Sequence, residues 1–199
     1  TARFAAYFNG APVVDVEGRS FPIEVRYRPL HEEDAEAPSL PEAVAAQIAQ
    51  AIRKTDKPVL VWLEFQDCAG NTESFLRASR PSAAEVVLDM LSVDYHETIM
   101  AAAGHQAEEN LAATVKQRAG SYIAVVEGSI PTGANGGYCT IGGRAAVDIA
   151  REVCGSAAAT IAIGTCAAFG GIPAASPNPT GALGVADAVP GVRNLINLS

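Results

Sequence analysis

Apolar side chains form continuous runs along the second part of the chain, and segments with helical spacing separate them. Residues 58–64 are almost wholly apolar, which is typical of a strand that is covered on both faces. Ser82 and Glu85 form a capping box that opens a helix. The pattern predicts further strands at 93–100, 121–127, 157–164 and 192–198, and further helices at 108–118 and 144–153. This alternation predicts an α/β domain with a doubly wound, mostly parallel sheet.

Residues 1–57 have a different pattern. Apolar and polar residues alternate from Phe21 to Tyr27, as in a half-buried strand, and residues 13–17 form its expected hairpin partner. A second capping box at Ser39 opens a helix with Val44, Ile48 and Ile52 on its apolar face. We therefore expect a β-hairpin plus helix appendage at 1–57 and the α/β domain at 58–199.

Composition and charge narrow the classes of function. The 199 residues are 49% hydrophobic, and the net charge of -8 argues against a nucleic-acid surface. No run of eighteen apolar residues predicts a membrane span, and the first ten residues do not resemble a signal peptide. We therefore expect a cytoplasmic protein whose four cysteines are reduced thiols or metal ligands.

Three of the four cysteines lie in segments that follow predicted strands. Cys68 lies in 66–73, Cys139 in 128–143, and Cys166 near the start of the glycine-rich segment 165–180. In a parallel sheet, ligands gather beyond the carboxyl ends of the strands, so these segments can form one site. Residues 128–199 hold most of the glycines and only six charged side chains, which suits loops covered by a partner or packed around a cofactor.

Thiolates at these positions are candidate ligands for a metal centre. Iron–sulfur clusters and zinc both bind thiolates, and zinc sites usually contain Cys-x-x-Cys pairs. No such pair occurs here, and the spacings of 71 and 27 residues favour ligands from separate loops of a large fold. Three unrelated buried thiols remain the alternative interpretation.

Several motifs from residue 58 onward resemble the N-terminal, flavodoxin-like domain of the small subunit of [NiFe] hydrogenases. They are Val59–Glu64, Asp67–Leu76, Val126–Thr132, Gly137–Cys139, Gly142-Gly143 and Gly164–Gly184, the last including Pro177-Asn178-Pro179-Thr180-Gly181. The resemblance implies that Cys68, Cys139 and Cys166 bind a proximal [4Fe-4S] cluster. It also implies a partner large subunit that contains the Ni–Fe centre, and a higher oligomer of such heterodimers. The family's two further cluster motifs are absent from the chain, and the chain alone is not expected to oxidise hydrogen.

The first cysteine segment departs from the family pattern, Cys-x-Gly-Cys-x-Glu. Here Asn71 stands in place of the second cysteine, so a different fourth cluster ligand is needed. Asp67 is the first candidate because a carboxylate is anionic, and Asn71 and Glu73 follow. This pattern resembles the actinobacterial-type, oxygen-insensitive subgroup, in which a carboxylate completes the cluster. Glu73 is either a residue of a proton route or an ordinary acid in the first turn of a helix that begins near Thr72.

Residues 1–57 resemble part of a DEAH-box RNA helicase, through Ala2–Phe8 and Val16–Tyr27. None of that family's ATP-binding or hydrolysis motifs is present, so helicase activity is not expected. The origin of this appendage stays open between a genuine fusion and an artificial junction.

Two other functions compete with electron transfer. One is a cluster-free α/β interaction module that docks on a partner subunit. The other is a flavin or nucleotide binder, disfavoured because a cysteine segment, and no phosphate-binding motif, follows the first strand. We expect Trp62 to belong to the core, Cys154 to be a packing thiol and His96 to have a structural role.

Overall fold

The chain divides into two units, 1–53 and 54–199. The computed structural model describes residues 57–199. The expected N-terminal hairpin, its helix and the helicase-like segment lie outside the described residues. Within the described part, no helix is long and apolar enough to cross a membrane.

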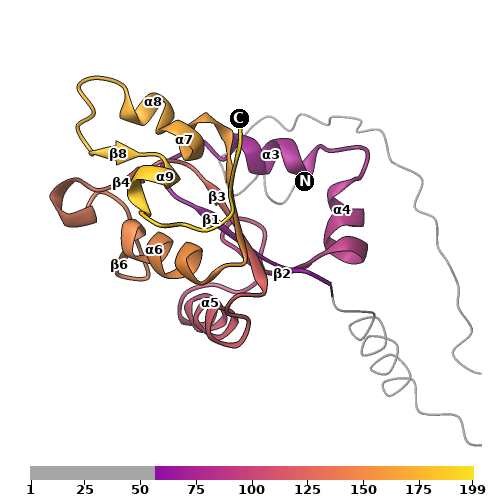
Figure 1. Cartoon of the computed structure of the whole chain (residues 1–199). Coiled ribbons are helices and arrows are strands. Elements are labelled where there is room, and N and C mark those ends of the chain that lie inside the picture. Colours follow the sequence, from indigo (N-terminus) through magenta and orange to yellow (C-terminus); the bar gives the residue numbers. More distant parts are fainter. Residues whose placement is uncertain (1–56) are drawn as a thin grey trace, which may run out of the picture. The chain divides into compact units, whose positions relative to one another are not determined.

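Five parallel strands form the central sheet of the described unit (Figure 1). The strand order β2-β1-β3-β7-β9 is the flavodoxin-like order 2-1-3-4-5 when these strands are counted along the chain. The predicted α/β class and parallel sheet are therefore confirmed. The strands are β1 (Val59–Glu64), β2 (Ser92–His96), β3 (Tyr122–Glu127), β7 (Ala159–Ile163) and β9 (Leu195–Leu198).

Helices connect successive strands, as a parallel sheet requires. The β1–β2 connection contains α3 (Gly70–Leu76), α4 (Ala83–Glu85) and a π-helical turn (Val86–Met90). The helix α5 (His105–Gln117) precedes β3, and α6 (Ala146–Ser156) precedes β7. The last connection contains α7 (Gly164–Phe169), α8 (Gly171–Ala174) and α9 (Val185–Ala188). Smaller elements are a 3₁₀ turn (Gly133–Gly136) and two short antiparallel pairs, β4 (Ile130–Pro131) with β8 (Ala182–Leu183) and β5 (Thr140–Ile141) with β6 (Arg144–Ala145).

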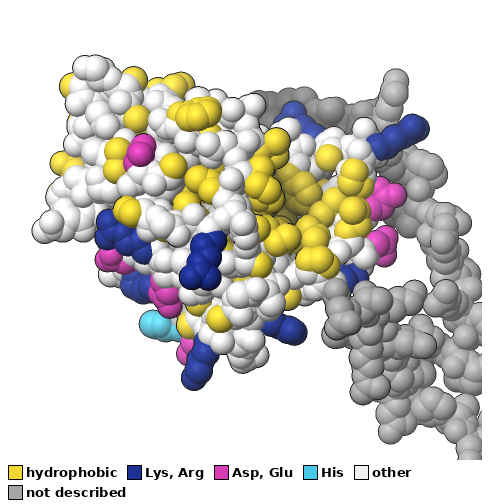
Figure 2. Space-filling model, viewed as in Figure 1, with side chains coloured by type: hydrophobic (Ala, Val, Ile, Leu, Met, Phe, Trp, Pro, Cys, Tyr) yellow, Lys and Arg dark blue, Asp and Glu magenta, His cyan; other side chains and the backbone are white. Residues whose placement is uncertain are grey.

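Both faces of β1 are apolar, which explains its continuous hydrophobic run. Val59, Val61 and Leu63 belong to the larger core, which also contains residues of α5, α6 and α9. Leu60 and Trp62 belong to a smaller cluster, packed against Phe75 of α3. Figure 2 shows apolar side chains gathered on the face between β9 and the helices α3 and α4. Trp62 and Cys154 are both buried, as expected.

Several element boundaries differ from the sequence predictions. The strand expected at 93–100 ends at His96, because the chain turns there toward α5. The helix expected at 82–91 keeps its capping box at Ser82 but continues as a π-helical turn. The helix expected from residue 144 begins at Ala146, because Arg144 and Ala145 pair with β5. The last strand begins at Leu195.

Truncating the fully buried Leu63 to alanine should lower the free energy of unfolding by about 2–5 kcal/mol, because it leaves a cavity in the larger core. The matched change Leu88→Ala removes the same atoms from a side chain that is 68% exposed and should cost less than about 0.5 kcal/mol. Urea unfolding of the three proteins measures both values. Equal losses would contradict the assignment of Leu63 to the core.

Candidate metal centre

Three neighbouring strands end level with one another. Glu64 of β1 lies opposite Glu127 of β3, which in turn lies opposite Ile163 of β7. The chain leaves β1 toward β2 on one side, whereas β3 leads to β7 on the other, so the strand order reverses between β1 and β3. Ligands of doubly wound sheets bind at this point. The segments carrying Cys68, Cys139 and Cys166 follow β1, β3 and β7 respectively.

The segment after β1 turns sharply around Cys68. Asp67 Oδ1 accepts a hydrogen bond of 2.8 Å from the backbone N–H of Ala69, which has a left-handed backbone with φ of 55°. Helix α3 then begins at Gly70, two residues earlier than expected. This turn leaves the Cys68 thiol exposed.

Glycines allow the three cysteine segments to approach one another closely. A Cβ atom on Gly171 would lie 2.6 Å from Cys166 Sγ, and one on Gly164 would lie 2.4 Å from Asn71 Nδ2. A Cβ on Gly128 would lie 2.9 Å from the backbone nitrogen of Gln66. A larger residue at Gly164 or Gly128 would collide with the segment after β1, and one at Gly171 would collide with Cys166 of its own segment. The side chain of Asn71 therefore lies against the start of α7, the helix that carries Cys166.

Cys166 lies on helix α7 and not in a loop, contrary to the sequence prediction. Gly164 at the start of this helix has φ of +80°, so the chain can turn directly from β7 into α7. The thiol keeps the expected place beyond the strand end. Cys166 is half-buried and unpaired in the described structure.

The charge of Asp67, in the segment that follows β1, acts on the Cys139 thiol. Burial, followed by the charges of Glu97 and Asp67, raises the pKa of the Cys139 thiol. Burial also raises the pKa of Asp67. The hydrogen bond from Ala69 lowers this pKa, whereas the charges of Glu127 and Glu64 raise it further. Cys139 thus faces the same acidic environment as Asp67, and a bound cation would favour both deprotonated ligands.

The three thiols are not arranged as a site for a single metal ion. Among residues 57–199, no group of three or more His, Cys, Asp or Glu side chains is arranged to hold one metal ion. A [4Fe-4S] cluster has a separate ligand for each iron, so its thiolates need not converge on one atom. Gly70 and Gly171 lie next to the sulfur atoms of Cys68 and Cys166 and place no side chain against them. The assignment of Cys68, Cys139 and Cys166 as ligands stays a prediction.

Glu73 lies on the exposed surface of α3. Its carboxylate forms an i,i+4 ion pair of 3.3 Å with Arg77, and 60% of its side chain is exposed. This arrangement is typical of a solvated helix surface and supports the structural interpretation of Glu73. The amide of Asn71, in contrast, lies against Gly164, and the charge of Asp67 acts on Cys139.

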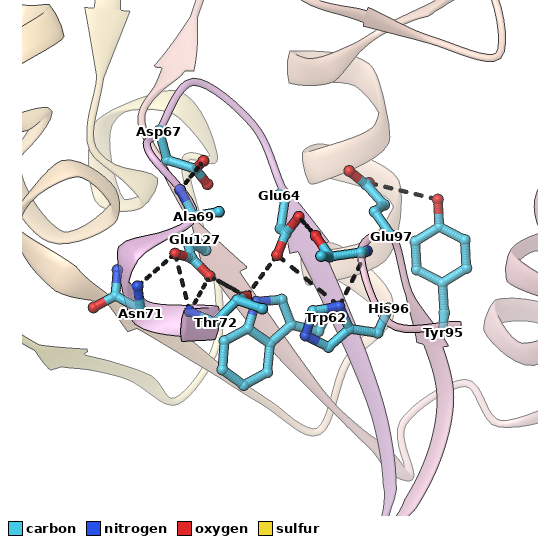
Figure 3. A network of polar contacts seen from close by, with 11 residues as sticks. Trp62, Glu64, Asp67, Ala69, Asn71, Thr72, Tyr95, His96, Glu97 and Glu127 are labelled. Atoms are coloured by element: carbon cyan, nitrogen blue, oxygen red, sulfur yellow. Dashed lines mark hydrogen bonds and ion pairs between the residues drawn. The ribbon is translucent and has the colours of Figure 1, made fainter. Parts of the chain in front are cut away.

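Glu127, which the sequence interpretation did not single out, is the most heavily hydrogen-bonded carboxylate near these segments (Figure 3). It is fully buried at the end of β3. Its oxygens accept hydrogen bonds from the backbone N–H groups of Asn71 at 2.8 Å and Thr72 at 3.1 Å. The Thr72 hydroxyl and the indole N–H of Trp62 donate to it at 2.6 and 3.2 Å. An acid that ends a buried apolar strand is the sequence signal that could have revealed it.

Glu64 and His96 extend this network toward β2. The Thr72 hydroxyl lies 2.5 Å from Glu64 Oε1, and the Thr98 hydroxyl donates to the same carboxylate. The His96 ring stacks on Trp62 with centroids 4.9 Å apart. Burial lowers the pKa of His96 against the opposing charges of Glu64 and Glu127. His96 Nδ1 accepts a hydrogen bond of 3.3 Å from the backbone N–H of Thr98. Nε2 has no hydrogen-bond partner among the described residues, so only one ring nitrogen of this expected structural histidine is hydrogen-bonded.

A cavity of about 490 Å³ opens beside this network, between β2, the start of α5 and the β5–β6 hairpin. Tyr95, Glu97, His105 and Glu108 supply its polar lining. Burial and the charge of Glu64 raise the pKa of Glu97 to about 8. Burial and the charge of Glu97 also raise the pKa of Tyr95, whose hydroxyl lies 3.5 Å from Glu97 Oε1.

The sequence matches a known family over most of the described region. Residues 68–198 match the family described as NADH ubiquinone oxidoreductase, 20 Kd subunit. The Hydrogenase-2 small chain of Escherichia coli strain K12 is 43% identical over 159 residues, which are 80% of this chain and 42% of that protein. This match is longer than the stretch from Pro58 to Ser199, so it also includes residues before Pro58. The chain spans about half the length of the curated relatives it matches.

Solved structures of hydrogenases share this fold. The Ni-Fe-Se hydrogenase of Desulfomicrobium baculatum superposes with a TM-score of 0.69 at 34% identity, covering 71% of this chain and 55% of that one. An actinobacterial-type NiFe-hydrogenase from Ralstonia eutropha superposes with a TM-score of 0.62 at 25% identity, covering 72% and 48%. The resemblance to the wider group is therefore stronger than the resemblance to the actinobacterial type.

Glu97 should make the free energy of unfolding depend on pH. Its pKa is raised in the folded chain, so the folded chain binds the proton more tightly than the unfolded chain does. The unfolding free energy should fall as pH rises from about 4.5 to 8, and Glu97→Gln should flatten this part of the profile. Urea unfolding at several pH values measures the slope. An identical slope in the variant would contradict the assignment, and Glu109→Gln, a surface change on α5, is the matched control.

Proposed function

The chain belongs to the family of the 20 kDa subunit of NADH ubiquinone oxidoreductase, and we propose that it is the cluster-binding part of a [NiFe] hydrogenase small subunit. In this role it carries electrons from hydrogen oxidation, which takes place at the Ni–Fe centre of a large subunit. The relatives named as hydrogenase small chains support the proposal. A cytoplasmic location and a higher oligomer of heterodimers stay predictions.

The arrangement of the three cysteines carries this proposal. Cys68, Cys139 and Cys166 follow three adjacent parallel strands, and glycines bring their segments together. We propose that they bind the proximal [4Fe-4S] cluster. When bound, the cluster accepts and passes on single electrons. The protein supplies the thiolates, holds them on neighbouring strand ends, and covers the cluster with a segment that has few charges.

We propose that Asp67 completes the ligand set. It adjoins Cys68, and its charge acts on Cys139. Asn71 offers only a neutral amide oxygen, a weaker ligand for iron than a carboxylate. An oxygen donor at one iron would place the chain with the actinobacterial-type hydrogenases, and we retain that subgroup as part of the proposal.

The first test is the iron and acid-labile sulfide content of the anaerobically purified complex with its large subunit. The wild type should contain the amounts of one [4Fe-4S] cluster for this chain, and Cys166→Ala should lose most of them. Cys154→Ala is the matched control, because this buried thiol lies in the larger core and should not affect the cluster. A folded wild-type complex without acid-labile sulfide would favour the cluster-free interaction module, because the only iron expected in it would then be that of the Ni–Fe centre.

The second test addresses the fourth ligand. Asp67→Ala should change the electron paramagnetic resonance spectrum of the reduced cluster, because an anionic donor is replaced at one iron. Asn71→Ala should leave that spectrum nearly unchanged. The opposite result, a changed spectrum only in Asn71→Ala, would exclude Asp67 as the ligand.

A further inference from the structure

Glu127 joins the core of the sheet to the segment that carries Cys68. It is the last residue of β3 and is fully buried. Two of its hydrogen bonds come from the backbone N–H groups of Asn71 and Thr72, in the first turn of α3. These donors lie three and four residues after Cys68. The carboxylate therefore fixes the helix start directly behind the cysteine turn.

The bonding pattern of Glu127 is that of an acceptor throughout. Two backbone N–H groups, the Thr72 hydroxyl and the Trp62 indole N–H all donate to its two oxygens. Hydrogen bonds to an ionised acceptor are stronger than neutral ones, so the arrangement holds a negative charge in the protein interior. This charge acts on the cysteine segment, because it contributes to the raised pKa of Asp67.

A fixed negative charge opposes the arrival of an electron at a nearby redox centre. The local dielectric constant is lower inside a protein than in water, which strengthens the effect. The N–H groups that bond to Glu127 are also occupied, and hydrogen bonds to cluster sulfurs are one of the factors that set a cluster's reduction potential. The charge of Glu127 and its occupation of these N–H groups therefore both lower the reduction potential.

We infer that Glu127 is a positioning residue that fixes the Cys68 segment and lowers the reduction potential of a cluster bound there. The inference rests on the proposed function and adds to it a residue that is not itself a ligand. Glu64 differs from Glu127 in a useful way. It accepts a hydrogen bond from the Thr98 hydroxyl and shares the single proton of the Thr72 hydroxyl with Glu127, but it accepts none from the backbone N–H groups of Asn71 or Thr72.

The test compares Glu127→Gln with Glu64→Gln in the complete heterodimer. Glutamine keeps the shape and one accepting oxygen, so the bond to Asn71 can persist while the charge is lost. Redox titration followed by electron paramagnetic resonance should show a midpoint potential raised by about 60 mV in Glu127→Gln, a tenfold change in the reduction equilibrium. The spectrum should also change, because the Cys68 turn relaxes. Glu64→Gln should give a smaller shift and an unchanged spectrum.

An unchanged potential in Glu127→Gln, or an equal shift in Glu64→Gln, would overturn the inference. If Glu127→Gln does not accumulate as a folded heterodimer, Trp62→Phe replaces it. That change removes one donor from the carboxylate without altering its charge, so the potential should fall, and a constant potential would overturn the inference. Failure of the proposed function is a separate result, because the wild-type heterodimer would then contain no acid-labile sulfide.

Discussion

The parallel register of β1, β3 and β7 is the constraint on which the rest of the structure depends. It places Glu64, Glu127 and Ile163 side by side, so the three segments that leave these strands start from one edge. A shift of one residue in β3 would turn Glu127 away from α3 and bring an apolar side chain to its place, because strand side chains alternate between faces. The apolar runs on both sides of β1 and β3 fix that register through the two clusters of the core.

Burying Glu127 would be costly without its donors, since an unpaired carboxylate in the interior loses its hydration. Four hydrogen-bond donors replace that hydration, and two of them belong to the backbone of α3. The first turn of that helix is thereby supplied with an acceptor from another strand, although its own N-cap side chain provides none. The position of Cys68 thus depends on a long-range contact between β3 and α3 as well as on the local turn between Asp67 and Ala69.

The sequence allowed the class of fold to be predicted because its main signal is local. The apolar run 58–64 and the capping box at Ser82 each predict an element from neighbouring residues, and both are present. The cysteine positions beyond the strands were also predictable, since strand ends in a parallel sheet share one edge. The helix at Cys166 was not predictable, because the glycines at both ends of α7 are typical of a loop. The role of Glu127 was not predictable either, because its partners lie 55 to 65 residues away.

The network around Glu127 also explains why this sheet edge is poorly suited to a phosphate group. In nucleotide-binding sheets, the free N–H groups of the helix after the first strand face the phosphate. Here the N–H groups of Asn71 and Thr72 are bonded to Glu127, and Glu64 and Asp67 add further negative charge beside them. A phosphate would meet like charges and occupied donors, whereas a centre containing iron cations would be attracted to the thiolates and the carboxylate. The same fold therefore selects its ligand through the residues at the ends of β1 and β3.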